Sequence, residues 1–71
     1  MKIKDYLRKN KVSRRDFAKK IKISRYSLQR YIEGRQPAAK QAWKIYSESD
    51  GQIKFEDMQY EEPPKNPLKD I

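Results

Sequence analysis

Apolar side chains recur at spacings of three and four residues along the first two thirds of the chain, which is the pattern of helices with one buried face. The pattern predicts four short helices. We expect them at about residues 2–10, 14–21, 25–33 and 38–47. Their apolar faces would share one small core, so the fold class that we expect is mostly α, with four to five short helices.

The residues between the expected helices mark where each helix begins and ends. Ser13, with Asp16 three residues later, and Ser24 can each accept a hydrogen bond from an unpaired amide at a helix start. Gly34 suits the end of the third helix, and Pro37 suits the first helical position of the fourth. About three residues separate the second helix from the third, a spacing that favours two short helices crossing steeply, as in a helix-turn-helix.

The segment after the fourth helix allows two conformations. An Asp-Gly turn signal comes first. Ile53 and Phe55 then alternate with polar residues as in a strand, although Phe55 to Met58 fits a final helical turn equally well. We favour a short C-terminal β segment. We expect Ile53, Phe55 and Met58 either to form a dimer surface or to seal the core of a single copy.

The sequence predicts a tail at the end of the chain. The sequence EEPPKNPLKDI carries three prolines and no periodic apolar pattern. A chain of 71 residues also leaves room for only one domain. We therefore expect one domain at residues 1–58, followed at residues 59–71 by a flexible, Pro-rich acidic tail that contributes little to the fold.

The residue types that the chain lacks exclude most kinds of chemistry. It has no Cys and no His, which removes disulfides, thiol nucleophiles and the commonest zinc ligands. Two glycines cannot build a phosphate-cradling loop. We therefore expect no enzyme activity, metal, cofactor or small-molecule substrate. Because no apolar run exceeds two residues, we also expect no membrane span and a cytoplasmic protein.

Positive charge is concentrated where the helices are expected. Residues 1–46 hold 15 Lys and Arg against 3 Asp and Glu, and residues 47–71 hold 3 against 7, within a net charge of +8. A basic body of this kind suits a polyanion, because neutralised phosphates release their condensed counterions. Nucleic acid is therefore the first candidate partner, although lysines also simply keep a small domain in solution.

Residues 13–37, SRRDFAKKIKISRYSLQRYIEGRQP, place small Ala18 in the second helix, Ser24 at the start of the third, and a glycine and a proline beyond it. This stretch resembles the Cro/repressor helix-turn-helix of phage and plasmid regulators. IYSESDGQIKFEDM at residues 45–58 is similar to the segment that follows the motif in small Cro-like regulators. The resemblance implies a lambda repressor-like DNA-binding fold. It departs at Lys22, where the family often has glycine and where a left-handed lysine would cost about 1 kcal/mol.

The third expected helix, residues 25–33, has an outer face suited to base edges. Arginine can donate two hydrogen bonds to guanine, and glutamine can pair with adenine. Tyr26 could instead touch a thymine methyl or a phosphate, and the arginines could be solvated surface charges. The resemblance implies a recognition helix whose residues facing the major groove are Ser24, Arg25, Tyr26, Gln29 and Arg30.

Basic and hydroxyl side chains around this helix suit the DNA backbone. Regulators of this type commonly pair, so that two recognition helices enter successive major grooves about 34 Å apart. The resemblance therefore implies a homodimer, formed in solution or only on DNA, and a palindromic operator. We expect phosphate contacts from Ser13, Arg14, Arg15, Arg35 and Lys40.

These expectations combine into one function, which is sequence-specific binding of double-stranded DNA by a Cro-like transcriptional repressor at the nucleoid. The alternative is a protein-interaction module, such as an antitoxin or a phage-encoded inhibitor, whose basic face binds an acidic partner. RNA is a third candidate, which the lack of glycine-rich and exposed aromatic RNA motifs disfavours.

Overall fold

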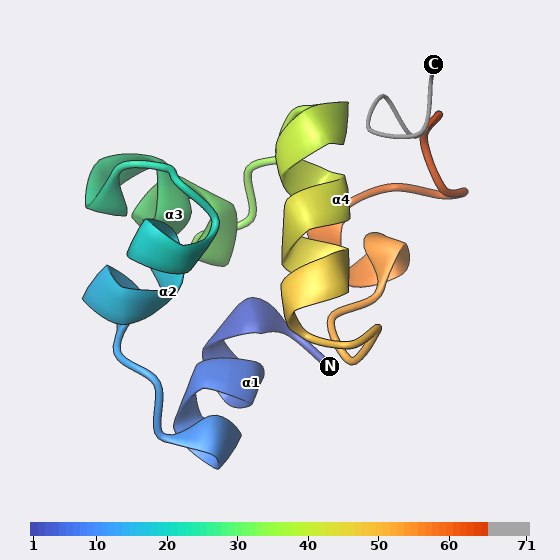
Figure 1. Cartoon of the computed structure of the whole chain (residues 1–71). Helices are drawn as coiled ribbons and strands as arrows, with labels where there is room; N and C mark the ends of the chain where they lie inside the picture. Colours follow the sequence, from blue (N-terminus) through green and yellow to red (C-terminus); the bar gives the residue numbers. More distant parts are fainter. Residues whose placement is uncertain (66–71) are drawn as a thin grey trace.

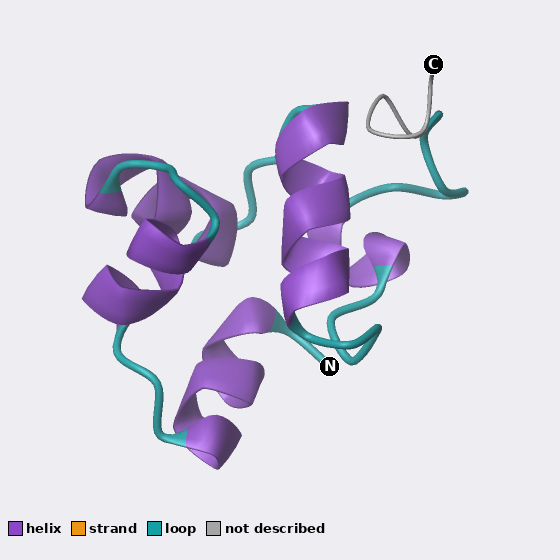
Figure 2. Ribbon diagram, viewed as in Figure 1, coloured by secondary structure: helices purple, strands orange, loops and turns teal. Residues whose placement is uncertain are grey.

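The computed structural model describes residues 1–65, and its regular secondary structure is helical throughout (Figure 2). A 3-10 helix follows four α-helices. The predicted mostly α fold with four helices is confirmed, and every predicted helix end lies within one residue of the observed one. The elements are α1 (Ile3–Asn10), α2 (Arg14–Lys20), α3 (Arg25–Ile32), α4 (Ala39–Glu48) and the 3-10 helix η1 (Phe55–Met58).

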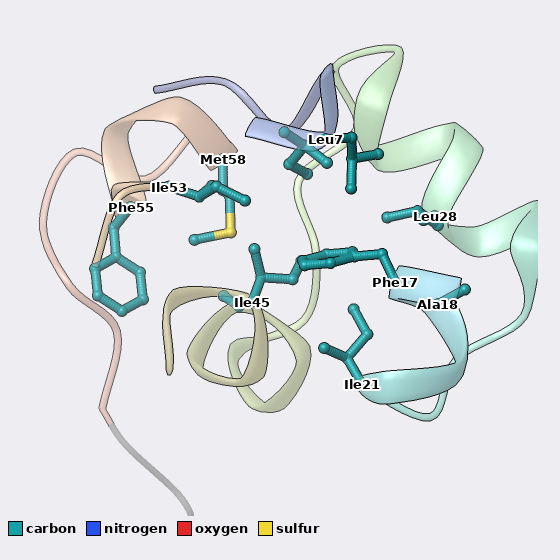
Figure 3. Packing of buried hydrophobic residues seen from close by; sticks show 11 residues of the cluster. Leu7, Phe17, Ala18, Ile21, Leu28, Ile45, Ile53, Phe55 and Met58 are labelled. Carbon is teal, nitrogen blue, oxygen red and sulfur yellow. The ribbon is translucent and has the colours of Figure 1, made fainter. Parts of the chain in front are cut away.

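The elements form two packed pairs around one core. In Figure 1, α2 lies against α3 on one side and η1 lies against α4 on the other, with α1 below them. Phe17 is central, between Ile45 and Leu28 (Figure 3). Burial of each such side chain stabilises the fold by about 1.5–3 kcal/mol. The buried apolar residues are Ile3, Leu7, Phe17, Ala18, Ile21, Leu28, Ala42, Ile45, Ile53, Phe55 and Met58.

Two serines cap helices as the sequence predicts. Ser13 Oγ accepts a hydrogen bond from the Asp16 amide at 3.0 Å, at the start of α2. Ser24 Oγ accepts one from the Ser27 amide at 3.0 Å, at the start of α3. Each bond satisfies an amide that the first helical turn leaves unpaired, and such a cap contributes about 1 kcal/mol. The starts of both helices of the motif are therefore set locally.

The turn between α2 and α3 passes through a left-handed lysine. Lys22 has a φ of 58°, a conformation that favours glycine. The Lys22 amide donates to the Lys19 carbonyl at 3.2 Å, and the Ile23 amide donates to the Ala18 carbonyl at 3.0 Å. This pair of bonds is the Schellman motif that ends many helices. The left-handed turn thus occurs where the family often has glycine, and here a lysine adopts it.

The segment at residues 55–58 corrects one expectation. It is the 3-10 helix η1 rather than the β segment that we favoured, so the helical turn that the pattern also allowed is the one observed. Asp57 Oδ2 accepts hydrogen bonds from the Lys54 amide at 3.1 Å and from the Met1 ammonium group at 2.7 Å. Because a 3-10 helix has three residues per turn, Phe55 and Met58 point to the same side and are both buried.

The expected dimer surface lies inside the single chain. Ile53, Phe55 and Met58 are only 0%, 7% and 2% exposed. The Phe55 ring lies 4.6 Å from Trp43 and 4.7 Å from Tyr46, measured between ring centroids. The prediction that these three residues form a dimer surface is therefore wrong for the folded chain, because their side chains seal its core, which was the other interpretation of the pattern.

The first part of the predicted tail contacts the domain. The Tyr60 hydroxyl donates a hydrogen bond to the Pro37 carbonyl, and Trp43 Nε1 donates one to the Pro64 carbonyl at 2.8 Å. Pro37 is itself buried and precedes the N-cap Ala38, so it lies outside α4 rather than at its first helical position. Residues 60–64 therefore add contacts to the fold that we did not expect. Residues 66–71 of the predicted tail lie outside the described residues.

Candidate nucleic-acid interface

α3 presents one face to the core and the opposite face to solvent. Leu28 on the inner face is fully buried, and Ile32 packs against the core. The helix is thus attached to the rest of the domain through its inner face. The five predicted base-reading residues all keep solvent exposure, with Ser24, Arg25 and Tyr26 exposed and Gln29 and Arg30 half-buried.

Hydrogen bonds link side chains along the outer face of α3. Arg30 Nη1 donates to the Tyr26 hydroxyl at 2.8 Å, and Arg30 Cζ lies 5.6 Å from the centre of the Tyr26 ring. Gln29 Nε2 donates to Glu33 Oε2 at 3.4 Å, which is a long bond and therefore a weak one. Gln29 can exchange this bond for a base edge at little cost.

The Ser24 hydroxyl both accepts and donates a hydrogen bond within the first turn of α3. The Ser24 oxygen accepts from the Ser27 amide and its hydroxyl donates to Ser27 Oγ, both at 3.0 Å. The observed role of Ser24 is therefore to fix the start of α3, which sets the direction in which Arg25 and Tyr26 leave the helix. A base contact from Ser24 stays a prediction.

The predicted phosphate-contacting residues lie at helix starts and in the loop before α4. Arg14 and Arg15 open α2, directly after the cap residue Ser13. Arg35 lies between α3 and α4, and Lys40 is in the first turn of α4. All five side chains are exposed. Within residues 1–65, the ion pairs are those of Met1 with Asp57 and of Lys20 with Glu48, so no carboxylate neutralises the four basic side chains of this set.

A cleft brings Arg35 close to the outer face of α3. It has a volume of about 440 Å³, and its lining includes Tyr26, Arg30, Arg35 and Tyr60. The Arg35 amide donates to the Arg30 carbonyl at 3.0 Å, so the chain leaves α3 with both arginines at the same cleft. Positive charge from the base-reading set and from the phosphate-contacting set is therefore continuous here.

Sequence reasoning missed Tyr60 as a neighbour of this cleft. Burial of the Tyr60 hydroxyl, together with the nearby Tyr31, raises its pKa above the ordinary value of 10.0, so it stays protonated and donates to Pro37 at neutral pH. Gln36 was missed in the same way, and its Nε2 donates to the Gln59 carbonyl at 2.8 Å. Both contacts join residues 23 positions apart, and no local sequence signal marks such a pair.

A short helix that is capped by serine, held by its inner face and reached through a tight turn from another short helix defines a class of protein. Together with an outer face of Arg, Gln and Tyr and with unpaired basic side chains on either side, these features define the class of helix-turn-helix DNA-binding domains.

The comparison with protein families agrees with this class. Residues 3–45, which run from α1 through most of α4, match a helix-turn-helix family of the Cro/C1 type, and the chain belongs to that family. Members of this family are DNA-binding proteins that generally regulate transcription, and the family is not one of enzymes. No curated protein and no solved structure gives a significant match to the chain. Among residues 1–65, no helix has the length and apolar character needed to span a membrane.

Proposed function

We propose that this protein is a Cro-like transcriptional repressor that reads a specific double-stranded sequence with the outer face of α3. The observation that carries the proposal is the division of α3 into a fully buried inner side at Leu28 and an outer side from which Arg25, Gln29 and Arg30 reach solvent. A helix held in this way can enter the major groove without disturbing the core.

Base reading would use the hydrogen-bonding groups of three side chains. The guanidinium groups of Arg25 and Arg30 can each donate two N–H groups to O6 and N7 of a guanine. The Gln29 amide can accept from N6 and donate to N7 of an adenine. Tyr26 belongs to the same reading face, next to Arg30.

Docking on the backbone would use the basic residues at the two ends of the motif. Arg14 and Arg15 at the start of α2 and Arg35 and Lys40 before and within α4 carry positive charge on exposed side chains without an ion-pair partner among residues 1–65. Such contacts fix the register of the protein on the duplex and supply affinity that does not depend on sequence. Ser13 would contribute through the α2 start that it caps.

Repression would follow from occlusion of a promoter. We propose that two copies occupy a palindromic operator in the cytoplasm, at the nucleoid, with half-sites about one helical turn or 34 Å apart. Because the apolar residues expected to pair two copies lie in the core, we place pairing on the DNA rather than in free solution.

Selection from a random duplex pool tests this function. The bound sequences are expected to converge on one palindromic consensus. Fluorescence anisotropy with the consensus duplex and a scrambled duplex of equal length, at several salt concentrations, should then give tighter binding to the consensus and a steep loss of affinity with salt on both. Equal affinity for both duplexes would contradict sequence-specific reading. Binding to an acidic protein, with no DNA selection, would instead support an interaction module.

A further inference from the structure

Tyr26 and Arg30 contact each other one helical turn apart on the outer face of α3. The hydrogen bond from Arg30 Nη1 to the Tyr26 hydroxyl measures 2.8 Å, and the guanidinium carbon lies 5.6 Å from the centre of the ring. Side chains four residues apart on a helix face each other, so α3 itself keeps this pair within reach. A hydroxyl and a ring thus act on the same guanidinium.

We propose that Tyr26 is a positioning residue, which holds the Arg30 guanidinium in one place on the reading face and on which the base preference exerted by Arg30 depends. The inference rests on the proposed function and assigns to Tyr26 a role through Arg30 rather than a base contact of its own.

The geometry leaves Arg30 able to read a base while Tyr26 holds it. A guanidinium has five N–H donors, and the contact with Tyr26 occupies one of those on Nη1. The adjacent N–H groups of Nε and Nη2 remain and form the planar fork that fits O6 and N7 of guanine. The Tyr26 oxygen accepts in this bond, so its own proton stays available to DNA or water.

Holding the side chain in advance matters because arginine is flexible. A free arginine must give up many rotamers when it binds a base, and a side chain already fixed loses less entropy at that step. Arg30 is half-buried although its partner Tyr26 is 69% exposed, which is the state of a guanidinium packed against a ring on the surface.

No ion pair within residues 1–65 neutralises the charge on Arg30. The carboxylate nearest in sequence, Glu33, accepts its hydrogen bond from Gln29 instead. Tyr26 orients Arg30 through a neutral hydroxyl, and no ion pair within residues 1–65 includes Arg30. The guanidinium is therefore positioned without losing its attraction for the DNA.

A double-mutant cycle tests the role of Tyr26. Tyr26→Phe keeps the ring and removes the hydroxyl, Tyr26→Leu removes both, and each is made alone and with Arg30→Ala. Binding is measured by anisotropy on the selected duplex and on duplexes altered at one base pair each. We expect Tyr26→Phe to reduce the preference about two- to fivefold, and Tyr26→Leu further, at the same base pair that Arg30→Ala affects. Neither should act further once Arg30 is alanine.

Affinity for scrambled duplex and the salt slope should not change in the Tyr26 variants. The matched control is Tyr6→Phe, which removes the α1 hydroxyl that donates to the Glu48 carbonyl at 3.4 Å and should leave base preference unchanged. In the free protein, ¹⁵N relaxation of the Arg30 Nε–H group should report greater mobility in both Tyr26 variants.

Three results would overturn the role of Tyr26 while leaving the proposed function intact. They are an unchanged preference in Tyr26→Leu, a loss at a different base pair, and an equal loss when Arg30 is already alanine. The second and third would mean that Tyr26 contacts DNA directly. If the unaltered protein selects no sequence at all, the proposed function fails and the role of Tyr26 fails with it.

Discussion

The left-handed turn at Lys22 leads to a specific prediction about stability. A residue with a Cβ in this conformation costs about 1–2 kcal/mol relative to glycine in the folded state. Glycine also raises the conformational entropy of the unfolded chain, which reduces the gain in stability by about 0.4–1 kcal/mol. Because Lys22 is exposed at a φ of 58°, its replacement sacrifices no core contact. We therefore expect Lys22→Gly to raise the free energy of unfolding by about 0.5–1 kcal/mol.

Urea and thermal unfolding, followed by far-ultraviolet circular dichroism, measure this change. In a domain of this size a gain of 1 kcal/mol corresponds to a rise in Tm of about 4–8 °C, so we expect a rise of about 2–8 °C. Lys22→Ala is the matched control, since it removes the same charge but keeps the Cβ. Its Tm should stay close to that of the unaltered protein. If alanine stabilises as much as glycine, relief of charge repulsion explains the gain and the conformational argument is refuted.

Three further predictions concern the DNA interface and the ion pair at η1. Arg30→Ala or Gln29→Ala should each cost about 1–3 kcal/mol of binding free energy at the selected duplex and relax preference at one base pair, as measured by anisotropy on single-substitution duplexes. Arg14→Ala should weaken binding to all sequences alike and lower the slope of log affinity against log salt by about one unit. Burial raises the pKa of Asp57, but hydrogen bonds from the Met1 ammonium and the Lys54 amide, together with the positive charges of Met1 and of the Lys54 side chain, lower it more, to a net value below 3.8. Asp57 should therefore stabilise the fold at pH values above its ordinary pKa of 3.8 and lose this contribution as pH falls through its lowered pKa, so that chemical denaturation gives a difference in the free energy of unfolding between the protein and Asp57→Asn that closes as the solution is acidified through that range.

A specific result would contradict each of these three predictions. Equal losses on scrambled and selected duplexes would reject base reading by Arg30 and Gln29. An unchanged salt slope would reject the phosphate contact of Arg14. A stability difference between the protein and Asp57→Asn that stays constant over the acid range would show that the ionised carboxylate does not contribute.

Local signals in the sequence were enough for the helix-turn-helix itself. Ser13 and Ser24 cap α2 and α3 as predicted, because a cap involves an amide only three residues away. The apolar spacing placed Leu28 on the inner face for the same reason, since helical periodicity is a property of a few neighbouring residues.

Packing contacts and side-chain rotamers, which the apolar spacing does not encode, decided the rest. Ile53 and Phe55 alternate with polar residues as a strand would, but η1 forms because Phe55 packs between rings of α4 and Asp57 takes up the Lys54 amide. The sequence also placed Tyr26 and Arg30 on one face of a helix, yet their hydrogen bond depends on rotamers that spacing alone does not specify.

The hydrogen bond from the Trp43 indole to the Pro64 carbonyl gives the molecule a spectroscopic reporter. Trp43 is the chain's only tryptophan and sits on α4, in edge contact with Phe55, whereas the reading face is on α3. Its fluorescence is therefore sensitive to whether the segment around Pro64 is docked on α4. Emission from one intrinsic fluorophore can follow the docking of this segment without any label on the face that meets DNA.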